Sequence, residues 1–128
     1  MNEQPKGELS IRVVAMPRDT NPAGDVFGGW LLSQMDIAGG VFCRKFAKGR
    51  VVTITIDSMT FNNPVFVGDT LCCYVSLVKI GRTSIKVQIE AYVNRDFETD
   101  KRIKVTEGEF TYVKLDKNRK PTPISEEL

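Results

Sequence analysis

No histidine occurs among the 128 residues of this sequence. Its absence excludes Ser/His/Asp and Cys/His nucleophile systems and the commonest zinc sites, because each of them depends on an imidazole. The sequence also lacks the Gly-x-Ser-x-Gly motif, the phosphate-binding P-loop and the dinucleotide-binding Gly-x-Gly-x-x-Gly motif. If the protein is an enzyme, we expect a carboxylate to carry out its acid–base chemistry, with no metal ion and no cofactor.

An excess of charge of one sign is also missing, since lysine and arginine number 18 and aspartate and glutamate 16. No basic run is interleaved with aromatic residues, so we expect no nucleic-acid partner. No apolar run approaches the length that spans a bilayer, and Met1–Lys6 lacks the apolar core of a signal peptide. These absences predict a cytoplasmic protein that does not bind a membrane. The length predicts one domain, residues 1–128, with an ordered core at about 9–116 and flexible termini.

Cysteine is limited to three residues, of which Cys72 and Cys73 are adjacent. On a strand, neighbouring side chains point to opposite faces, and this is poor geometry for a disulfide framework. We therefore expect the cysteines to be reduced thiols in the core.

Five segments have the alternation or the β-branched content of strands, and they cover residues 9–16, 50–61, 70–80, 85–94 and 102–115. Gly81, between the third and fourth segments, predicts a hairpin. In the second segment Val52, Ile54 and Ile56 fall on one face. In the last segment the apolar positions change parity near Gly108, and this change predicts a β-bulge.

A helix is expected to follow the turn-rich loop Asn21–Trp30 and to run to about Ala47. One stripe of this helix consists of Leu32, Met35, Gly39, Phe42 and Phe46. Because Ile37 and Val41 lie on the far side, we expect protein to surround the helix on nearly every side. One antiparallel sheet of about five strands, wrapped around the helix in an α+β domain, would cover only one side. Burial alone therefore predicts pairing with a second copy.

Asp36 is the only acidic residue in this apolar stretch. Gly39 and Gly40 follow it, and each costs about 1 kcal/mol relative to alanine inside a helix, so another group must approach closely there. For Gly39 we expect a tightly packed strand, whereas Gly40 could border a ligand channel beside Asp36. At the helix opening, Gly28 and Gly29 leave main-chain amides accessible to another molecule, where the helix dipole favours negative charge.

Several segments of the chain occur in the order found in one protein family: Asn21–Trp30, Ser33–Asp36, Arg50–Thr53 and Pro64–Asp69. In these segments the chain resembles the acyl-CoA thioester hydrolases of the hotdog fold. More narrowly, it resembles the small bacterial broad-specificity acyl-CoA thioesterases, and the similarity runs from about Leu9 to Pro123.

This resemblance implies a five-stranded antiparallel sheet wrapped around a long central helix. It also implies homodimers that join their sheets and assemble as a trimer of dimers, a homohexamer, with active sites at the dimer interface. By the same resemblance, Asp36 is catalytic and Asn21 comes from the facing subunit to hold the substrate or the water.

The expected substrate is an acyl-CoA, hydrolysed to free acid and coenzyme A. The thioester carbonyl gathers negative charge as it is attacked, and the amides of Gly28 and Gly29 could donate to that oxygen. Asp36 would either deprotonate water or attack directly to give a mixed anhydride. The sequence leaves both routes open.

For coenzyme A, the turn residues Gly81, Arg82, Thr83 and Ser84 are our preferred phosphate contacts, although a solvated hairpin tip has the same pattern. The resemblance implies that Met59, Thr60 and Phe61 flank the pantetheine arm. Arg44 and Lys45, on the polar edge of the helix, are weaker candidates for contacts with coenzyme A.

Two other interpretations compete with hydrolysis. A non-catalytic acyl-CoA binding or sensing module would use the same pocket without turnover, and Asp36 would then be a buried carboxylate satisfied by neighbouring amides. Dehydratases of the same fold are disfavoured, because the resemblance implies that they need a histidine. An uncompensated carboxylate in an apolar helix favours an enzyme.

Overall fold

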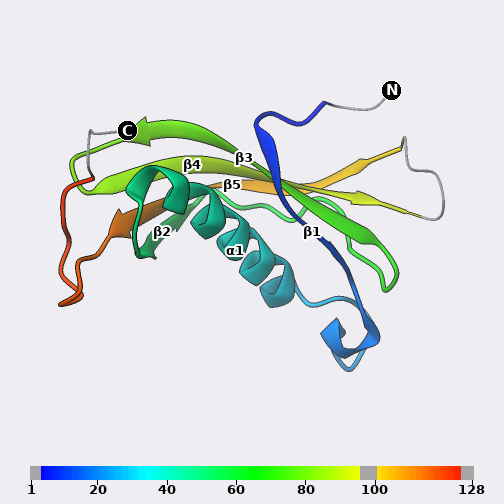
Figure 1. Ribbon diagram of the computed structural model, residues 1–128. Coiled ribbons are helices and arrows are strands. Elements are labelled where there is room, and N and C mark those ends of the chain that lie inside the picture. Colours follow the sequence, from blue (N-terminus) through cyan, green and yellow to red (C-terminus); the bar gives the residue numbers. More distant parts are fainter. Residues whose placement is uncertain (1–3, 96–100, 125–128) are drawn as a thin grey trace.

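The computed structural model describes residues 4–95 and 101–124. One long helix, α1 (Gly28–Ala47), packs against five strands: β1 (Glu8–Val14), β2 (Val51–Asp57), β3 (Thr70–Ile80), β4 (Ser84–Asn94) and β5 (Ile103–Lys114). The strands form one antiparallel sheet in the order β1-β3-β4-β5-β2, and α1 lies in the hollow of its curved face (Figure 1). The predicted α+β architecture, with the sheet wrapped around the helix, is confirmed.

The hairpin predicted at Gly81 joins β3 to β4. The Gly81 amide donates to the main-chain oxygen of Ser84 at 2.8 Å, and the paired register runs from Ile80–Ile85 to Thr70–Asn94. The residues of β4 that face α1 are buried, as the alternation predicted, and include Ile85, Val87, Ile89, Ala91 and Val93.

The apolar stripe of α1 faces the sheet as predicted. Met35, Gly39 and Phe42 are buried, and Leu32 and Phe46 are partly buried against the core. Burial of this face supplies the main hydrophobic contact between the helix and the sheet. No helix in the described residues is long and apolar enough to cross a membrane.

The opposite side of α1 is open in the protomer. Ile37 is 53% exposed and Val41 is 46% exposed, so the sheet of one chain covers only one side of the helix, as we had expected. Ile54, on the edge strand β2, is also 53% exposed. Exposed apolar groups on a helix face and on a sheet edge are typical of surfaces that another chain covers.

The bulge of β5 lies three residues before its predicted place. The pairing between β4 and β5 changes register between Lys104 and Thr106, so the extra residue is Val105 rather than a residue near Gly108. Gly108 has a different role, because a Cβ atom there would lie 2.6 Å from Cγ of Met59. A second bulge, at Ile54 in β2, interrupts the predicted alternation of that strand.

β2 ends at Asp57, four residues before the predicted end at Phe61. Ser58 adopts a left-handed conformation with φ 57°, which turns the chain out of the strand. The following segment still contacts β5, because the Thr106 hydroxyl donates to the main-chain oxygen of Thr60 at 2.6 Å.

The chain remains attached to the domain beyond Asp116, where we had expected a flexible tail. The Asp116 carboxylate accepts hydrogen bonds from the amides of Asn118 and Lys120. The Ile124 amide donates to the main-chain oxygen of Arg82 at 2.9 Å, which ties this segment to the β3–β4 hairpin. The C-terminal segment is therefore held by specific hydrogen bonds as far as Ile124.

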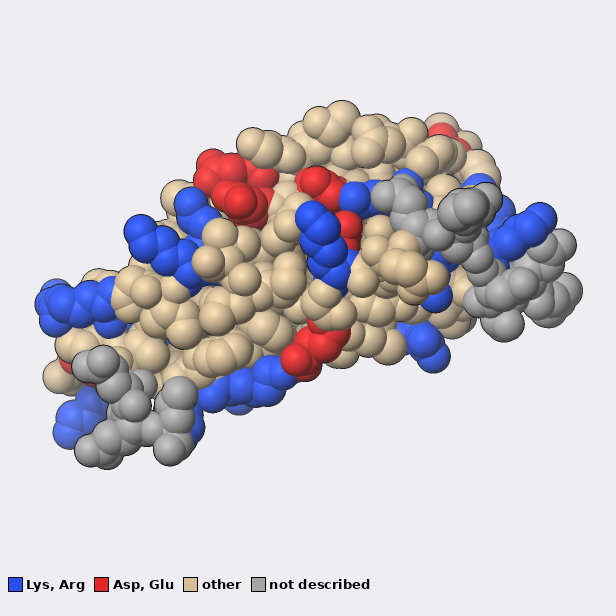
Figure 2. Space-filling view, turned by 90° about the horizontal axis from the view of Figure 1, so that it is seen from above, with Lys and Arg blue, Asp and Glu red and all other residues tan. Residues whose placement is uncertain are grey.

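Figure 2 shows the face of the sheet that is turned away from α1, where acidic and basic side chains are interspersed. Glu90 is buried on this face and accepts hydrogen bonds from the Lys6 amide at 2.7 Å and from Lys104 Nζ at 3.0 Å. Tyr74 and Tyr92 pack edge to face beside it. These contacts satisfy the buried carboxylate within the protomer.

The three cysteines are free and buried, as predicted. Cys43 lies on the buried face of α1, and Cys73 points from β3 into the core. Burial raises the pKa of both thiols to about 12. They are therefore protonated, unreactive core residues near neutral pH.

Candidate functional site

Asp36 lies near the middle of α1, half-buried, and β2 and β5 hold its carboxylate. Oδ1 accepts a hydrogen bond from the Thr53 hydroxyl at 2.5 Å and lies 3.0 Å from the Tyr112 hydroxyl. The Tyr112 hydroxyl also lies 2.7 Å from the main-chain oxygen of Asp36, so its single proton is shared between two acceptors. Among residues 4–95 and 101–124 no donor binds Oδ2, which leaves that oxygen for another molecule.

The sheet register brings the two hydroxyls together, because Thr53 and Tyr112 are paired neighbours on β2 and β5. Gly39 makes room for them, since a Cβ atom there would lie 2.2 Å from the Tyr112 hydroxyl oxygen and 2.7 Å from Ile89 Cδ1. The tight packing predicted for Gly39 is confirmed. At Gly40 a Cβ atom would lie 3.8 Å from the Tyr112 ring, which is an ordinary contact, so a ligand channel there stays a prediction.

Tyr112 is only 2% exposed. Burial, and then the neighbouring Asp36 carboxylate, raise the pKa of Tyr112 far above its usual range. The phenol therefore keeps its proton and acts as a donor to Asp36. Neither Thr53 nor Tyr112 was predicted from the sequence as a site residue. In the strand alternation, Tyr112 falls on the same inward face as Phe110. This position could have identified Tyr112, because the hydroxyl of an inward-facing tyrosine must find a hydrogen-bond partner.

Asn21 organises the loop before α1. Its Oδ1 accepts hydrogen bonds from the amides of Ala23 at 3.0 Å and Asp25 at 3.1 Å, and its main-chain amide donates to the Asp25 oxygen at 2.7 Å. Gly24 completes the turn with φ 91°, a conformation that favours glycine. Asn21 is exposed at the surface beside the start of the helix.

Gly28 and Gly29 are the first two residues of α1, and both are exposed. The first helical hydrogen bonds, from Trp30 and Leu31, go to the main-chain oxygen of Phe27. In the part of the chain that the structure describes, the amides of Gly28 and Gly29 have no acceptor. They are the unpaired donors expected at a helix N-terminus.

The structure separates these amides from Asp36 within one protomer. Asp36 follows Gly29 by seven residues, or two helical turns, which corresponds to about 10 Å along the helix axis. An oxyanion donor must lie within about 3 Å of the oxygen it stabilises. The acid group and the helix-opening amides of one chain are therefore not adjacent along the helix.

Of the residues predicted to flank pantetheine, Phe61 lies beside the helix opening. The Phe61 ring is about half-exposed, and its Cζ lies 3.7 Å from the Cβ position of Gly28. Met59 is half-buried against Gly108, and Thr60 is exposed. The structure thus brings Phe61 beside one predicted oxyanion donor.

The predicted phosphate contacts at residues 81–84 lie at the other end of the sheet. The Gly81 amide is used by the turn itself, and the Lys114 amide donates to the Thr83 oxygen. Arg82 is exposed, whereas Thr83 and Ser84 are partly buried. Side chains, rather than the Gly81 amide, are the groups that this turn can offer to a phosphate.

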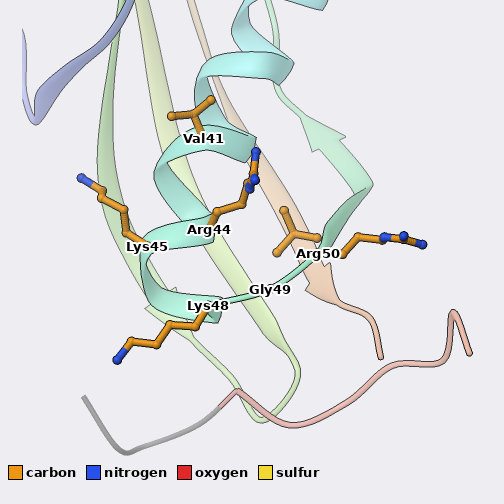
Figure 3. Close-up of a pocket in the computed structure, with 7 residues that line it drawn as sticks. Val41, Arg44, Lys45, Lys48, Gly49 and Arg50 are labelled. Atoms are coloured by element: carbon orange, nitrogen blue, oxygen red, sulfur yellow. The ribbon is translucent and has the colours of Figure 1, made fainter. Parts of the chain in front are cut away.

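A pocket of about 760 Å³ lies where the C-terminal end of α1 meets the start of β2. It is lined by Val41, Arg44, Lys45, Lys48, Gly49, Arg50 and Val51, and we call it the basic pocket (Figure 3). Four of its lining residues are cations, and none is acidic. The pocket includes Arg44 and Lys45, the weaker candidates predicted from the sequence for contacts with coenzyme A.

Comparison with known proteins identifies the family. The Thioesterase superfamily profile matches residues 23–96. Acyl-CoA thioester hydrolase YciA of Salmonella typhimurium is 49% identical over 126 residues, which cover 97% of this chain and 95% of that protein.

Two solved structures agree with this match. HI0827, a hexameric broad specificity acyl-coenzyme A thioesterase, superposes with a TM-score of 0.92 at 44% identity, covering 98% of this chain and 86% of that one. Cj0915, a hexameric hotdog fold thioesterase of Campylobacter jejuni, gives a TM-score of 0.87 at 46% identity, covering 94% and 92%. The chain therefore belongs to the thioesterase superfamily and, within it, to the hotdog-fold acyl-CoA thioester hydrolases.

Proposed function

We propose that this protein hydrolyses acyl-CoA thioesters to free acid and coenzyme A, with Asp36 as general base or nucleophile. The observation that carries the proposal is the way in which hydrogen bonds hold the Asp36 carboxylate. Two hydroxyls fix Oδ1, while Oδ2 has no donor among the described residues. A carboxylate held in this way is oriented for proton transfer or for attack.

Both chemical routes use the same oriented group. In the general-base route, Asp36 takes a proton from water as the water oxygen bonds to the thioester carbonyl carbon. The carbon–sulfur bond then breaks, and the coenzyme A sulfur leaves as a thiolate that takes up a proton. In the nucleophilic route, Asp36 bonds to the carbonyl carbon and the carbon–sulfur bond breaks, so that coenzyme A leaves as a thiolate that takes up a proton. Water then hydrolyses the resulting mixed anhydride to the free acid and regenerates Asp36. Neither route draws on a metal ion or a cofactor.

The oxyanion hole is formed by the amides of Gly28 and Gly29 of the partner subunit. The separation of about 10 Å between Asp36 and these amides within one chain supports an active site built from two protomers. Asn21 belongs to the same loop as the amides, so it enters the site from the same partner. The unpaired edge of β2 and the exposed Ile37 and Val41 provide surfaces for that partner.

The proposed assembly is a homohexamer built as a trimer of dimers, because HI0827 and Cj0915 are both hexameric. Met59, Thr60 and Phe61 flank the pantetheine arm in this arrangement, and the contact of Phe61 with Gly28 supports their place beside the oxyanion hole. We place the protein in the cytoplasm, where its three free thiols stay reduced.

A steady-state assay that follows free thiol release from acyl-CoAs of several chain lengths tests the function. Asp36→Asn keeps an oxygen acceptor for Thr53 and Tyr112 but removes the base, so we expect a folded protein with kcat lowered by about 10²–10⁴. Asp57→Asn, an exposed acid at the end of β2, is the matched control and should keep wild-type turnover. A wild-type protein that binds acyl-CoA without releasing thiol would be a binding module instead.

A further inference from the structure

The chain that follows β2 takes the place of a partner strand beside the rest of β5. Regular pairing of β2 with β5 ends at Asp57 and Glu109, and the left-handed Ser58 turns the chain out of the strand. Residues 59–63, which we call the docked segment, then run along β5 and are held by individual hydrogen bonds rather than by a ladder. Because separate contacts fix the docked segment, the loss of one of them can shift its position.

Thr106 makes one of these contacts from within the core. It is fully buried and is paired with Ala91 on β4, whose side chain is also fully buried. Its hydroxyl donates to the main-chain oxygen of Thr60 at 2.6 Å. A buried hydroxyl costs stability unless it is hydrogen-bonded, and valine would fill the same space without a polar group. Packing alone therefore does not account for a threonine here, whereas the contact with the docked segment does.

The β-bulge of β5 provides two further contacts. The register with β4 changes between Lys104 and Thr106, around Val105. The Val105 oxygen accepts from the Asn62 amide at 2.8 Å, and the Lys104 oxygen accepts from Asn63 Nδ2 at 2.7 Å. In a regular strand, successive carbonyl groups point to opposite edges, whereas here two successive oxygens bind one segment. The irregularity of β5 thus serves to hold the docked segment.

The side chains of the docked segment connect β5 with the opening of α1. Met59 packs against β5 at Gly108, where a Cβ atom would lie 2.6 Å from Met59 Cγ. The Phe61 ring lies 3.7 Å from the Cβ position of Gly28, the first residue of α1. Thr60 lies between these two contacts, so a shift of its main chain would move Phe61 relative to the helix opening.

We propose that Thr106 is a positioning residue for substrate binding, whose hydroxyl fixes the docked segment where Met59 and Phe61 flank the pantetheine arm. The proposal rests on the proposed function for the identity of the ligand. Thr106 acts through Thr60 and does not contact the substrate, because its own side chain is fully buried. Its hydroxyl should therefore affect the binding of substrate more than the chemical step.

Calorimetric titration with coenzyme A, together with thermal denaturation, separates this role from a role in packing. Thr106→Val keeps the shape of the side chain and removes the donor, so we expect a melting temperature close to that of the wild type. Its affinity for coenzyme A should fall about two- to tenfold, as the loss of one hydrogen bond allows. Thr106→Ser keeps the donor but loses a buried methyl group, so it should have a lower melting temperature and wild-type affinity. Thr111→Val, on the same strand, is the control and should bind as the wild type does.

Amide hydrogen exchange follows the docked segment without a ligand. The Asn62 amide donates to the Val105 oxygen, so its exchange rate depends on how firmly the docked segment is held. We expect faster exchange at Asn62 in Thr106→Val than in the wild type, and the wild-type rate in Thr111→Val.

Steady-state kinetics and a second variant extend the test. In Thr106→Val, KM for acyl-CoA should rise while kcat stays within about twofold of the wild-type value, because ground-state and transition-state binding are weakened equally. The loss of affinity should be equal for coenzyme A and pantetheine, since both contain the arm that the docked segment flanks. Asn63→Ala removes another hydrogen bond of this segment at an exposed residue, and should weaken binding even if Thr106→Val folds poorly.

Wild-type affinity for coenzyme A in folded Thr106→Val, or in Asn63→Ala where Thr106→Val does not fold, would overturn the proposal. An equal loss of affinity in Thr106→Ser would also overturn it, because packing would then be the cause. Faster exchange at Asn62 with unchanged affinity would likewise overturn it, since the docked segment would then be held without lining the binding site. A wild-type protein that binds coenzyme A but releases no thiol from acyl-CoA would refute the enzyme function and leave the role of Thr106 intact.

Discussion

The hydroxyl of Tyr112 lies 2.7 Å from the main-chain oxygen of Asp36 and 3.0 Å from its carboxylate Oδ1. One side chain of β5 thus holds both the backbone and the acid group of the residue at the centre of the site. Thr53 approaches the same Oδ1 from β2, so the carboxylate is fixed from two strands. This arrangement makes the orientation of Asp36 a property of the sheet register.

Tyr112→Phe removes the hydroxyl and leaves the ring. We expect the free energy of unfolding to fall by about 1–3 kcal/mol, because acceptors on Asp36 lose a buried donor. We also expect a lower kcat with little change in KM, because the variant disturbs the orientation of the acid rather than a contact with substrate. Thermal denaturation and steady-state kinetics on the same preparation measure both effects. Full activity in the variant would show that Tyr112 does not position Asp36.

Gly39→Ala should be destabilising, because the new Cβ atom would lie 2.2 Å from the Tyr112 hydroxyl oxygen. Overpacking of this kind typically costs about 1–3 kcal/mol. Gly40→Ala is the matched control, since its Cβ atom would meet only an ordinary contact and alanine gains about 1 kcal/mol of helix propensity. If Gly40 borders a ligand channel, Gly40→Ala will keep or raise the melting temperature but raise KM. Equal melting temperatures for the two variants would contradict the close approach of Tyr112 to Gly39.

Gly28→Pro tests the oxyanion donor with little change in backbone. Proline is favoured at the first position of a helix, and the preceding Phe27 has φ −77° and ψ 148°, which suits a residue before proline. The variant should fold and lose one amide donor, and kcat should fall by about 10²–10³ if that amide stabilises the oxyanion. Gly28→Ala keeps the amide and is the control. A similar kcat for both variants would remove the Gly28 amide from the mechanism.

At alkaline pH, the free energy of unfolding should depend on the ionisation of Tyr112. Burial and the Asp36 carboxylate raise the pKa of Tyr112, so the native state favours the neutral phenol over the tyrosinate. The resulting stabilisation is fully present below the unfolded pKa of about 10 and is lost as the pH rises above that value. Unfolding free energies measured across this range should fall less steeply for Tyr112→Phe than for the wild type. Parallel curves for the two proteins would contradict a raised pKa.

The buried thiols give a further prediction. Because burial raises the pKa of Cys43 and Cys73 to about 12, both should react very slowly with a thiol-exchange reagent at pH 8 in the native protein. All three cysteines should react once the protein is unfolded in denaturant. Rapid labelling of Cys43 or Cys73 in the native state would show that the core opens at these positions.

Local patterns in the sequence predicted the helix and the β3–β4 hairpin correctly, whereas the role of Asp36 stays a prediction. The stripe through Met35 and Phe42 and the turn at Gly81 each depend on residues within a few positions of one another. The end of β2 was predicted wrongly, because the left-handed Ser58 that breaks the strand has no such pattern. The bulge at Val105 was placed too late for a similar reason, since a bulge is set by the pairing with β4 rather than by one strand.

The support of Asp36 could not be predicted, because it joins distant parts of the chain. Thr53 is 17 residues from Asp36 in the sequence, and Tyr112 is 76 residues away. Only the pairing of β2 with β5 brings the two hydroxyls to one carboxylate. Gly39 indicated that another group packs closely against the helix, but it did not indicate which residue that is.

Subunit complementation tests the shared active site most directly. Asp36→Asn and Gly28→Pro protomers, each inactive alone, can be co-expressed with different tags and the mixed assemblies purified. If each site takes its acid from one protomer and its amides from the partner, random pairing should restore about a quarter of wild-type activity, because half of the pairs are mixed and each has one intact site. Activity no greater than that of the two separate variants would show that acid and amides do not come from different protomers, and would contradict the proposed mechanism.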